Sequence, residues 1–324
     1  MPKDSLELRS NLIACLPSLV IEEVAAESGQ RVVYFGHFED HLIPPDISAR
    51  IQPDASDEEQ SDFLNGWEKW GRVVVKVVGD ASVDALSRLQ AETAILNELR
   101  PVNFPSLLYS NLFVDNPVTD ERLPERLYVS IEEFVVSSTL AKTMDDYKQN
   151  VPAVIDVCTG IANALLPLWM HPRRFVHRDI KPENILIRPS GNVVVIDLGI
   201  VRETGAVGLT CDGWGKAPLT VDFAAPEQIA NDKDAISFKT DFFAIGVLMY
   251  RLISGKHPFR TRTGMDSFEL AIAIEKNEPP TLHSIGAANS EVSAFVAWTM
   301  RKAPWQRPRT PTKFLEALSS LKNP

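Results

Sequence analysis

Short apolar runs separated by turn-forming residues dominate the first third of the chain. Runs rich in β-branched residues at 19–25, 31–38 and 72–78 predict three strands. Between the second and third runs, residues 40–67 are polar, proline-containing and acidic, which predicts an inserted loop. Exposure to solvent is its simplest role, and docking of a partner is the alternative.

A helical pattern follows at 84–100, where leucines recur at spacings of seven and three. Glu92 falls within this apolar stripe, so it needs a partner. Lys76 ends an apolar run of valines, where a lone charge is costly. We therefore expect an ion pair between Lys76 and Glu92, the alternative being two surface residues that do not touch.

The rest of the chain is mostly helical. A strand is expected at 127–134, leading into an extended connection. The expected helices lie at 151–170, 241–253, 266–277, 290–302 and 311–322.

One β-hairpin interrupts this helical part. The runs 185–187 and 193–196 flank a turn of Pro, Ser, Gly and Asn. Antiparallel pairing brings the residue before the first strand, Asn184, beside the residue after the second, Asp197. Amide and carboxylate oxygens suit Mg²⁺, which takes few protein ligands and completes its shell with water and phosphate.

Further motifs surround this hairpin. His177, Arg178 and Asp179 precede Asn184, Leu198 and Gly199 follow Asp197, and Ala225-Pro226-Glu227 comes later. In this ordered set the chain resembles the eukaryotic-type protein kinases of the serine/threonine branch. The resemblance covers residues 19–322.

The resemblance implies a bilobal α+β fold, with a small antiparallel β-sheet lobe carrying one helix and a larger, mainly α-helical lobe. On this basis residues 1–18 are an N-terminal extension. Residues 19–134 form the small lobe, which includes the 40–67 insertion, and residues 135–324 form the large lobe.

The resemblance also implies roles in phosphoryl transfer from ATP. Asp179 would accept the proton of the substrate hydroxyl, and Lys181 would face the γ-phosphate. Asn184 and Asp197 would hold Mg²⁺. Lys76, held by Glu92, would bind the α- and β-phosphates.

The nucleotide base is expected at residues 131–134. There Ile131 resembles the gatekeeper, while the carbonyl of Glu132 and the N–H of Phe134 would pair with adenine. The glycine-rich loop is represented by Gly29 alone. A single glycine and the nearby Glu27 predict modest affinity for ATP.

Other positions point to the acceptor and to structural support. Lys181, two residues after Asp179, and Thr220, seven residues before Glu227, resemble the serine/threonine branch. The same resemblance pairs Glu227 with Arg307 in a buried ion pair. It makes Asp241 a brace for the backbone of the catalytic loop.

Arg178 precedes the catalytic aspartate, a feature that in this family accompanies activation by loop phosphorylation. We expect phosphorylated Thr204 or Thr210 to pair with Arg178 and order the loop.

Composition limits the partners. The net charge of −10 over 324 residues argues against nucleic acid or an anionic membrane as the main partner. Cys15, Cys158 and Cys211 lack metal-site spacing and even pairing, which favours a reducing compartment. No signal peptide or apolar run of about 20 residues is evident, so we expect a cytoplasmic protein without a membrane span.

Two hypotheses of different class remain. The first is an active serine/threonine kinase acting on proteins, including itself, with ATP and Mg²⁺. The second is a pseudokinase that serves as a nucleotide-binding scaffold or switch. A small-molecule phosphotransferase is disfavoured by Glu227 and Arg307, which belong to the protein-substrate platform. The sequence does not name the substrate protein, the activating signal or the oligomeric state.

Overall fold

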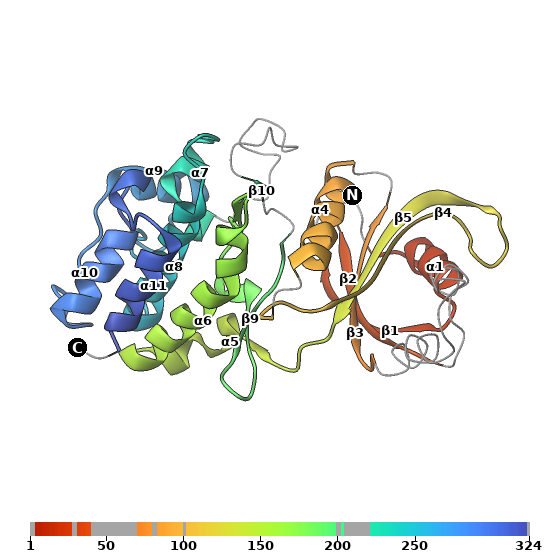
Figure 1. Ribbon diagram of the computed structural model, residues 1–324, viewed down its shortest axis with the longest axis horizontal. Coiled ribbons are helices and arrows are strands. Elements are labelled where there is room, and N and C mark those ends of the chain that lie inside the picture. The colour runs from red at the N-terminus through yellow and green to blue at the C-terminus, as the bar shows by residue number, and fades with distance from the viewer. Residues whose placement is uncertain are drawn as a thin grey trace. The chain divides into compact units, whose positions relative to one another are not determined.

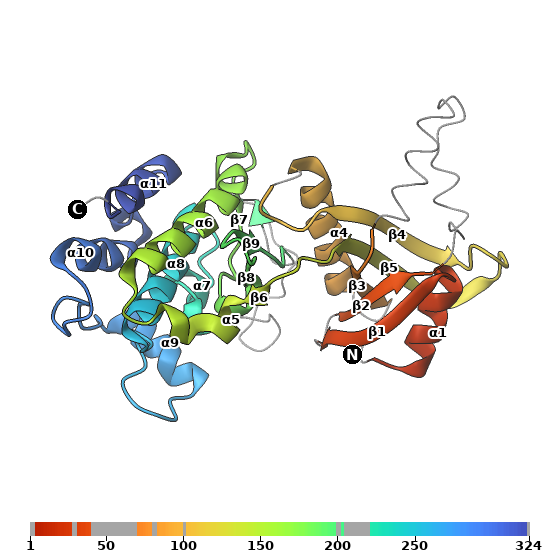
Figure 2. The ribbon, with the colours of Figure 1, turned by 90° about the horizontal axis from the view of Figure 1, so that it is seen from below.

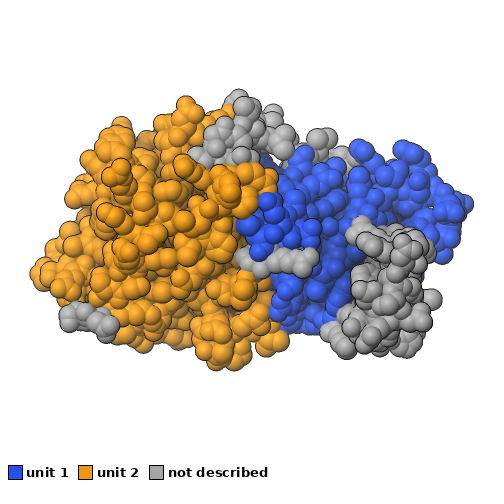
Figure 3. All heavy atoms as spheres, in the orientation of Figure 1, with its two compact units in different colours: residues 1–100, 105–134 blue, residues 101–104, 135–324 orange. Residues whose placement is uncertain are grey.

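The computed structural model describes residues 4–27, 31–39, 70–79, 83–99, 102–198, 202–203 and 221–322. The chain divides into two units, shown in different colours in Figure 3. Unit 1 consists of residues 1–100 and 105–134, and unit 2 of residues 101–104 and 135–324.

Unit 1 is built on a five-stranded antiparallel sheet with the order β1-β2-β3-β5-β4. Its strands are β1 (Leu19–Glu27), β2 (Val32–Phe38), β3 (Val73–Gly79), β4 (Leu107–Asp115) and β5 (Arg122–Glu133). The three strands expected in the first third of the chain are present, with ends shifted by one or two residues.

Two helices cover opposite faces of this sheet (Figure 1). Helix α4 (Val83–Leu99), which the apolar pattern predicts, packs on one face through residues such as Leu89. Helix α1 (Leu6–Cys15) lies on the other face, where Leu12 is fully buried among the β-strand valines. The apolar pattern of these residues does not predict a helix, and the resemblance assigns residues 1–18 to an N-terminal extension.

Unit 2 is mainly helical (Figure 2). Its α-helices are α5 (Leu140–Thr143), α6 (Val151–Met170), α7 (Pro226–Ile229), α8 (Phe238–Ser254), α9 (Ser267–Lys276), α10 (Ser290–Thr299) and α11 (Pro311–Ser320). Its 3₁₀ turns are η1 (Met144–Tyr147), η2 (Pro182–Asn184), η3 (Val221–Phe223) and η4 (Pro304–Gln306). Its strands are β6 (Ser138–Thr139), β7 (Phe175–Val176), β8 (Ile185–Ile187), β9 (Val193–Val195) and β10 (Arg202–Glu203).

Aromatic side chains join the long helices of unit 2. Trp169 of α6 meets Phe242 of α8 edge to face, and Phe242 stacks on Phe314 of α11 with ring centroids 4.2 Å apart. Helix α8 ends at Gly255, whose left-handed backbone (φ 70°) suits a residue without a Cβ. The predicted α+β architecture is confirmed.

Helix α6 has the length and composition of a membrane-spanning segment, with a mean hydropathy of 1.6 over its apolar window. Half of that window is buried inside the protein, and residues such as Ile161 and Leu165 are fully covered. This burial is the behaviour of a core helix, which passes the same test of length and composition.

Candidate active site

The predicted hairpin joins the two expected metal ligands, Asn184 and Asp197. Ile185 pairs with Val195 across β8 and β9, and the N–H of Ile196 donates to the carbonyl of Asn184 at 2.9 Å. Asn184 therefore lies at the open end of the hairpin, directly before the first strand, and Asp197 lies just after the second.

Three of the expected site residues form one hydrogen-bonded cluster in the 177–184 loop. The ammonium of Lys181 lies 2.6 Å from Oδ2 of Asp179. The amide nitrogen of Asn184 donates to the carbonyl of Asp179 at 2.9 Å and to its Oδ2 at 3.0 Å. Because the amide nitrogen of Asn184 is used in this way, its amide oxygen faces away from Asp179 as an acceptor.

The surroundings of this cluster raise the pKa of Asp179. Burial raises the pKa of the Asp179 carboxyl above its ordinary value, and the negative charge of Asp197 acts in the same direction. Lys181 opposes this shift through its charge and its hydrogen bond. A carboxylate whose pKa is raised in this way is a better proton acceptor than a solvated one.

The backbone is strained at two of these positions. Arg178 has φ 70° and Asp197 has φ 69°, both in the left-handed region that non-glycine residues rarely adopt. Each such residue costs about 1–3 kcal/mol and persists only where its surroundings hold it. Strain of this kind is typical of functional sites.

Asp241 of α8 holds the strained loop in place. Its carboxylate accepts hydrogen bonds from the N–H groups of His177 and Arg178 at 3.0 and 2.9 Å, and from the indole N–H of Trp169 at 2.8 Å. Asp241 is completely buried, and this burial raises its pKa. The predicted brace of the loop backbone is therefore present, and Trp169 is a third donor that the sequence analysis missed.

The predicted ion pair of Glu227 and Arg307 is also present and buried. The guanidinium of Arg307 approaches the two carboxylate oxygens of Glu227 at 2.6 and 2.9 Å, a bidentate arrangement. It also donates to the carbonyls of Arg301, Lys239 and Lys302.

The residue next to Glu227 connects this pair to the 177–184 loop. The side-chain amide of Gln228 donates to the carbonyl of Arg178 at 2.9 Å. One helical turn, α7, thus holds Arg307 through Glu227 and the loop through Gln228.

In unit 1 the predicted contact between Lys76 and Glu92 is present. The ammonium of Lys76 lies 2.6 Å from Oε1 of Glu92, and both side chains are buried. A second carboxylate, Oε1 of Glu132, also lies 2.6 Å from this ammonium. Arg31 donates to the other oxygen of Glu92 at 3.0 Å.

The register of β5 decides which of its side chains lies beside Lys76. The side chain of Ile131 is packed in the core that α1 covers, on the face of the sheet away from Lys76. Glu132, and not Ile131, therefore lies on the face of the sheet that carries the Lys76 side chain. Because β5 is buried on both faces, its apolar pattern does not show which side chains share a face.

Several predicted positions lie outside the described residues. They are Gly29, the 40–67 insertion, Thr204, Thr210 and Thr220. Phe134 is described and lies directly after β5, where its ring meets Phe35 edge to face.

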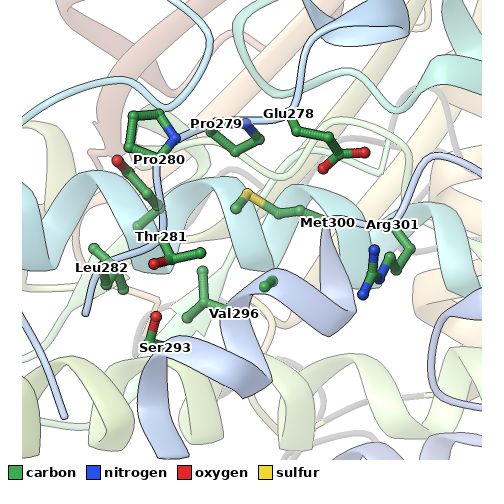
Figure 4. Close-up of a pocket in the computed structure, with 11 residues that line it drawn as sticks. Glu278, Pro279, Pro280, Thr281, Leu282, Ser293, Val296, Met300 and Arg301 are labelled. Carbon is green, nitrogen blue, oxygen red and sulfur yellow. The ribbon is translucent and has the colours of Figure 1, made fainter. Parts of the chain in front are cut away.

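Unit 2 also has a pocket of about 170 Å³ (Figure 4). Pro280, Thr281 and Leu282, in the connection that follows α9, face Ser293 and Val296 of α10 across it. The hydroxyl of Ser293 accepts a hydrogen bond from the N–H of His283. None of the predicted site residues that the structure describes lines this pocket, although Arg301, whose carbonyl accepts a hydrogen bond from Arg307, does.

The motif residues occur within a match to a known family. A model of the protein kinase domain matches residues 68–318. The chain belongs to the protein kinase family. The match includes Lys76 and Glu92 of unit 1 and the 177–184 loop, Glu227 and Arg307 of unit 2.

The relatives of this chain include named serine/threonine kinases. A serine/threonine-protein kinase PknA of Corynebacterium glutamicum is 31% identical over 178 residues, 55% of this chain and 36% of the relative. PknA of Mycobacterium tuberculosis H37Rv is 35% identical over 152 residues, 47% of this chain and 33% of the relative.

A plant protein is similar to the same extent. Mitogen-activated protein kinase kinase 2 of Arabidopsis thaliana is 32% identical over 187 residues, 55% of this chain and 48% of the relative. The matched parts therefore span between a third and a half of the length of these three relatives.

Proposed function

We propose that this kinase transfers the γ-phosphate of ATP to serine and threonine hydroxyls of proteins, its own included. The cluster of Asp179, Lys181 and Asn184 carries the proposal, because it joins a proton acceptor, a cation and an oxygen ligand within hydrogen-bonding distance. Phosphoryl transfer needs positioning and charge compensation more than covalent chemistry.

Asp179 receives the proton of the substrate hydroxyl as that oxygen attacks the γ-phosphorus. The burial that raises the pKa of Asp179 makes its carboxylate more basic. Lys181 neutralises charge on the transferring phosphate, and its present contact with Asp179 keeps it close to the reacting hydroxyl.

Asn184 and Asp197 fit a magnesium site that depends on the nucleotide. The amide nitrogen of Asn184 is bound to Asp179, so its oxygen is oriented as a ligand. Among the described residues, no group of three or more His, Cys, Asp or Glu side chains could hold a metal by itself. Two oxygen ligands completed by phosphate oxygens and water match the preference of Mg²⁺, which when bound neutralises phosphate charge.

Lys76 binds the α- and β-phosphates, and Glu92 holds it in place. Because Glu132 lies beside Lys76 and Ile131 does not, the proposed adenine contacts move one residue along the chain. They become the carbonyl of Glu133 and the N–H of Val135, in place of the carbonyl of Glu132 and the N–H of Phe134.

The choice of serine and threonine rests on Lys181 and on the relatives. A lysine two residues after the catalytic aspartate resembles the serine/threonine branch, and the PknA relatives carry that name. The bidentate pair of Glu227 and Arg307 supports a protein substrate, because it belongs to the platform of kinases that act on proteins.

The test is transfer of labelled phosphate from ATP with Mg²⁺ to the chain itself and to a generic basic protein. Asp179→Asn keeps the shape of the side chain and removes the base. Asp156→Asn is the matched control, since this carboxylate is 67% exposed.

We expect label on both acceptors for the wild type and for Asp156→Asn, and its loss for Asp179→Asn. Equal labelling by Asp179→Asn would overturn the proposed role. Binding of ATP without any transfer by the wild type would instead support the pseudokinase hypothesis.

A further inference from the structure

Lys76 is shared between two buried carboxylates. Its ammonium lies 2.6 Å from Glu92 and 2.6 Å from Glu132. All three residues are less than 7% exposed. Arg31 completes the cluster by pairing with Glu92 at 3.0 Å.

The register of the sheet produces this second contact. Lys76 of β3 lies opposite Ser130 of β5, and Glu132 lies two residues further along β5, on the same face. The hydroxyl of Ser130 donates to Oε1 of Glu132 at 3.3 Å. The strand register therefore directs the Glu132 side chain toward Lys76, and the hydroxyl of Ser130 donates a hydrogen bond to its carboxylate.

A carboxylate at this position is costly without the lysine. Glu132 is buried, and its desolvation raises its pKa, while Lys76 acts in the opposite direction. An apolar side chain of similar volume would avoid that desolvation. Glu132 therefore depends on Lys76 as its counter-ion.

The contact with Glu132 also reduces the net positive charge that Lys76 presents to a phosphate. The positive charges of Arg31 and Lys76 are matched by the negative charges of Glu92 and Glu132 when all four are ionised. A phosphate approaching Lys76 therefore meets a cluster without excess positive charge, and it meets the Glu132 carboxylate as a like charge.

We propose that Glu132 is an affinity-determining residue that competes with the phosphates of ATP for Lys76. This inference rests on the proposed function, in which Lys76 is the phosphate-binding lysine. It predicts that this kinase binds ATP more weakly than the same protein without the Glu132 charge, independently of its glycine-rich loop.

Glu132→Gln is the most direct variant, because it keeps the length of the side chain and removes the charge. The full chain is titrated calorimetrically with ATP and Mg²⁺ and, separately, with adenosine, which has the base but no phosphate. Glu121→Gln, an exposed carboxylate of unit 1, is the matched control.

We expect Glu132→Gln to lower the dissociation constant of ATP about tenfold, because one repulsive charge near the phosphates is removed. The dissociation constant of adenosine stays the same, so the ratio of the two constants changes. A variant that only disturbed packing would weaken both ligands. In the transfer assay the KM for ATP falls while kcat is retained.

An unchanged or raised dissociation constant of ATP in Glu132→Gln, with the wild type binding ATP, overturns this inference and leaves the proposed function intact. Absence of ATP binding in both proteins overturns the proposed function as well. If thermal unfolding shows that Glu132→Gln does not fold, Glu132→Met replaces it, with the same expected and contradicting results.

Discussion

The backbone N–H of Arg178 donates a hydrogen bond to the buried carboxylate of Asp241 at 2.9 Å, although the two residues are 63 positions apart. Arg178 has a left-handed backbone and directly precedes Asp179. The bond therefore anchors the proposed catalytic aspartate to the most buried helix of unit 2, α8, through the strained residue beside it.

Asp241→Asn tests this anchor. Three donors point at the carboxylate, and the amide of asparagine would turn a donor of its own toward one of them. We expect a loss of about 1–3 kcal/mol in the free energy of unfolding and a fall in kcat of at least about tenfold. Chemical unfolding and the transfer assay measure the two effects, and an unchanged kcat would contradict the anchoring role.

The buried ion pair of Glu227 and Arg307 should make a large contribution to the free energy of unfolding. Arg307→Met leaves a buried carboxylate without its partner, and we expect a loss of about 3–5 kcal/mol. The double variant Arg307→Met with Glu227→Gln should recover part of this loss. Urea unfolding measures all three proteins.

The matched control for that pair is Lys322→Ala, which breaks the exposed pair with Asp156. Exposed pairs contribute about 0–1 kcal/mol. Equal losses of free energy of unfolding in Arg307→Met and Lys322→Ala would show that the buried Glu227 pair contributes no more than the exposed pair.

Helix α1 should contribute to the core of unit 1. Leu12 is fully buried and Leu6 is 86% exposed on the same helix. Leu12→Ala is expected to lower the free energy of unfolding by about 2–5 kcal/mol, while Leu6→Ala changes it by less than about 0.5 kcal/mol. Similar effects of the two substitutions would mean that α1 does not pack on the sheet.

Lys302 should give the stability a dependence on alkaline pH. Burial lowers its pKa from 10.5 to about 8, and its ammonium donates to the carbonyl of Ile274 at 2.7 Å. Between these values the unfolded chain holds a proton that the folded protein has released, so this contribution to stability rises with pH. Below about pH 8 the folded protein bears the cost of a partly buried charge.

Lys302→Met removes that contribution. The stability of the variant relative to the wild type should therefore be highest at pH 7 and decrease toward pH 10.5, as measured by urea unfolding at several pH values. A difference in stability between variant and wild type that stays constant across this pH range would contradict a lowered pKa of Lys302.

Much of the fold was predictable because its patterns were local. The hairpin of β8 and β9 follows from two β-branched runs around a strong turn. The pairing of Lys76 with Glu92 follows from two charges in apolar surroundings, each of which needs a counter-charge.

Helix α1 and the place of Glu132 were missed for physical reasons. The segment of α1 has a weak apolar periodicity, and its burial depends on a sheet formed by later residues. In β5 nearly every residue from Leu127 on is buried, so alternation carries no information about faces. The sequence did hold one usable signal: the polar residues Ser130 and Glu132 are two positions apart, so they must lie on the same face of the strand.

We propose that Asp179 accepts the proton of the substrate hydroxyl when serine and threonine are phosphorylated. The most direct measurement uses three basic peptides that are identical except for Ser, Thr or Tyr at the acceptor position, each incubated with labelled ATP, Mg²⁺ and either the wild type or Asp179→Asn. We expect label on the Ser and Thr peptides from the wild type, none on the Tyr peptide, and none from the variant. Label that persists in the variant, or that appears on the Tyr peptide alone, would contradict this proposal.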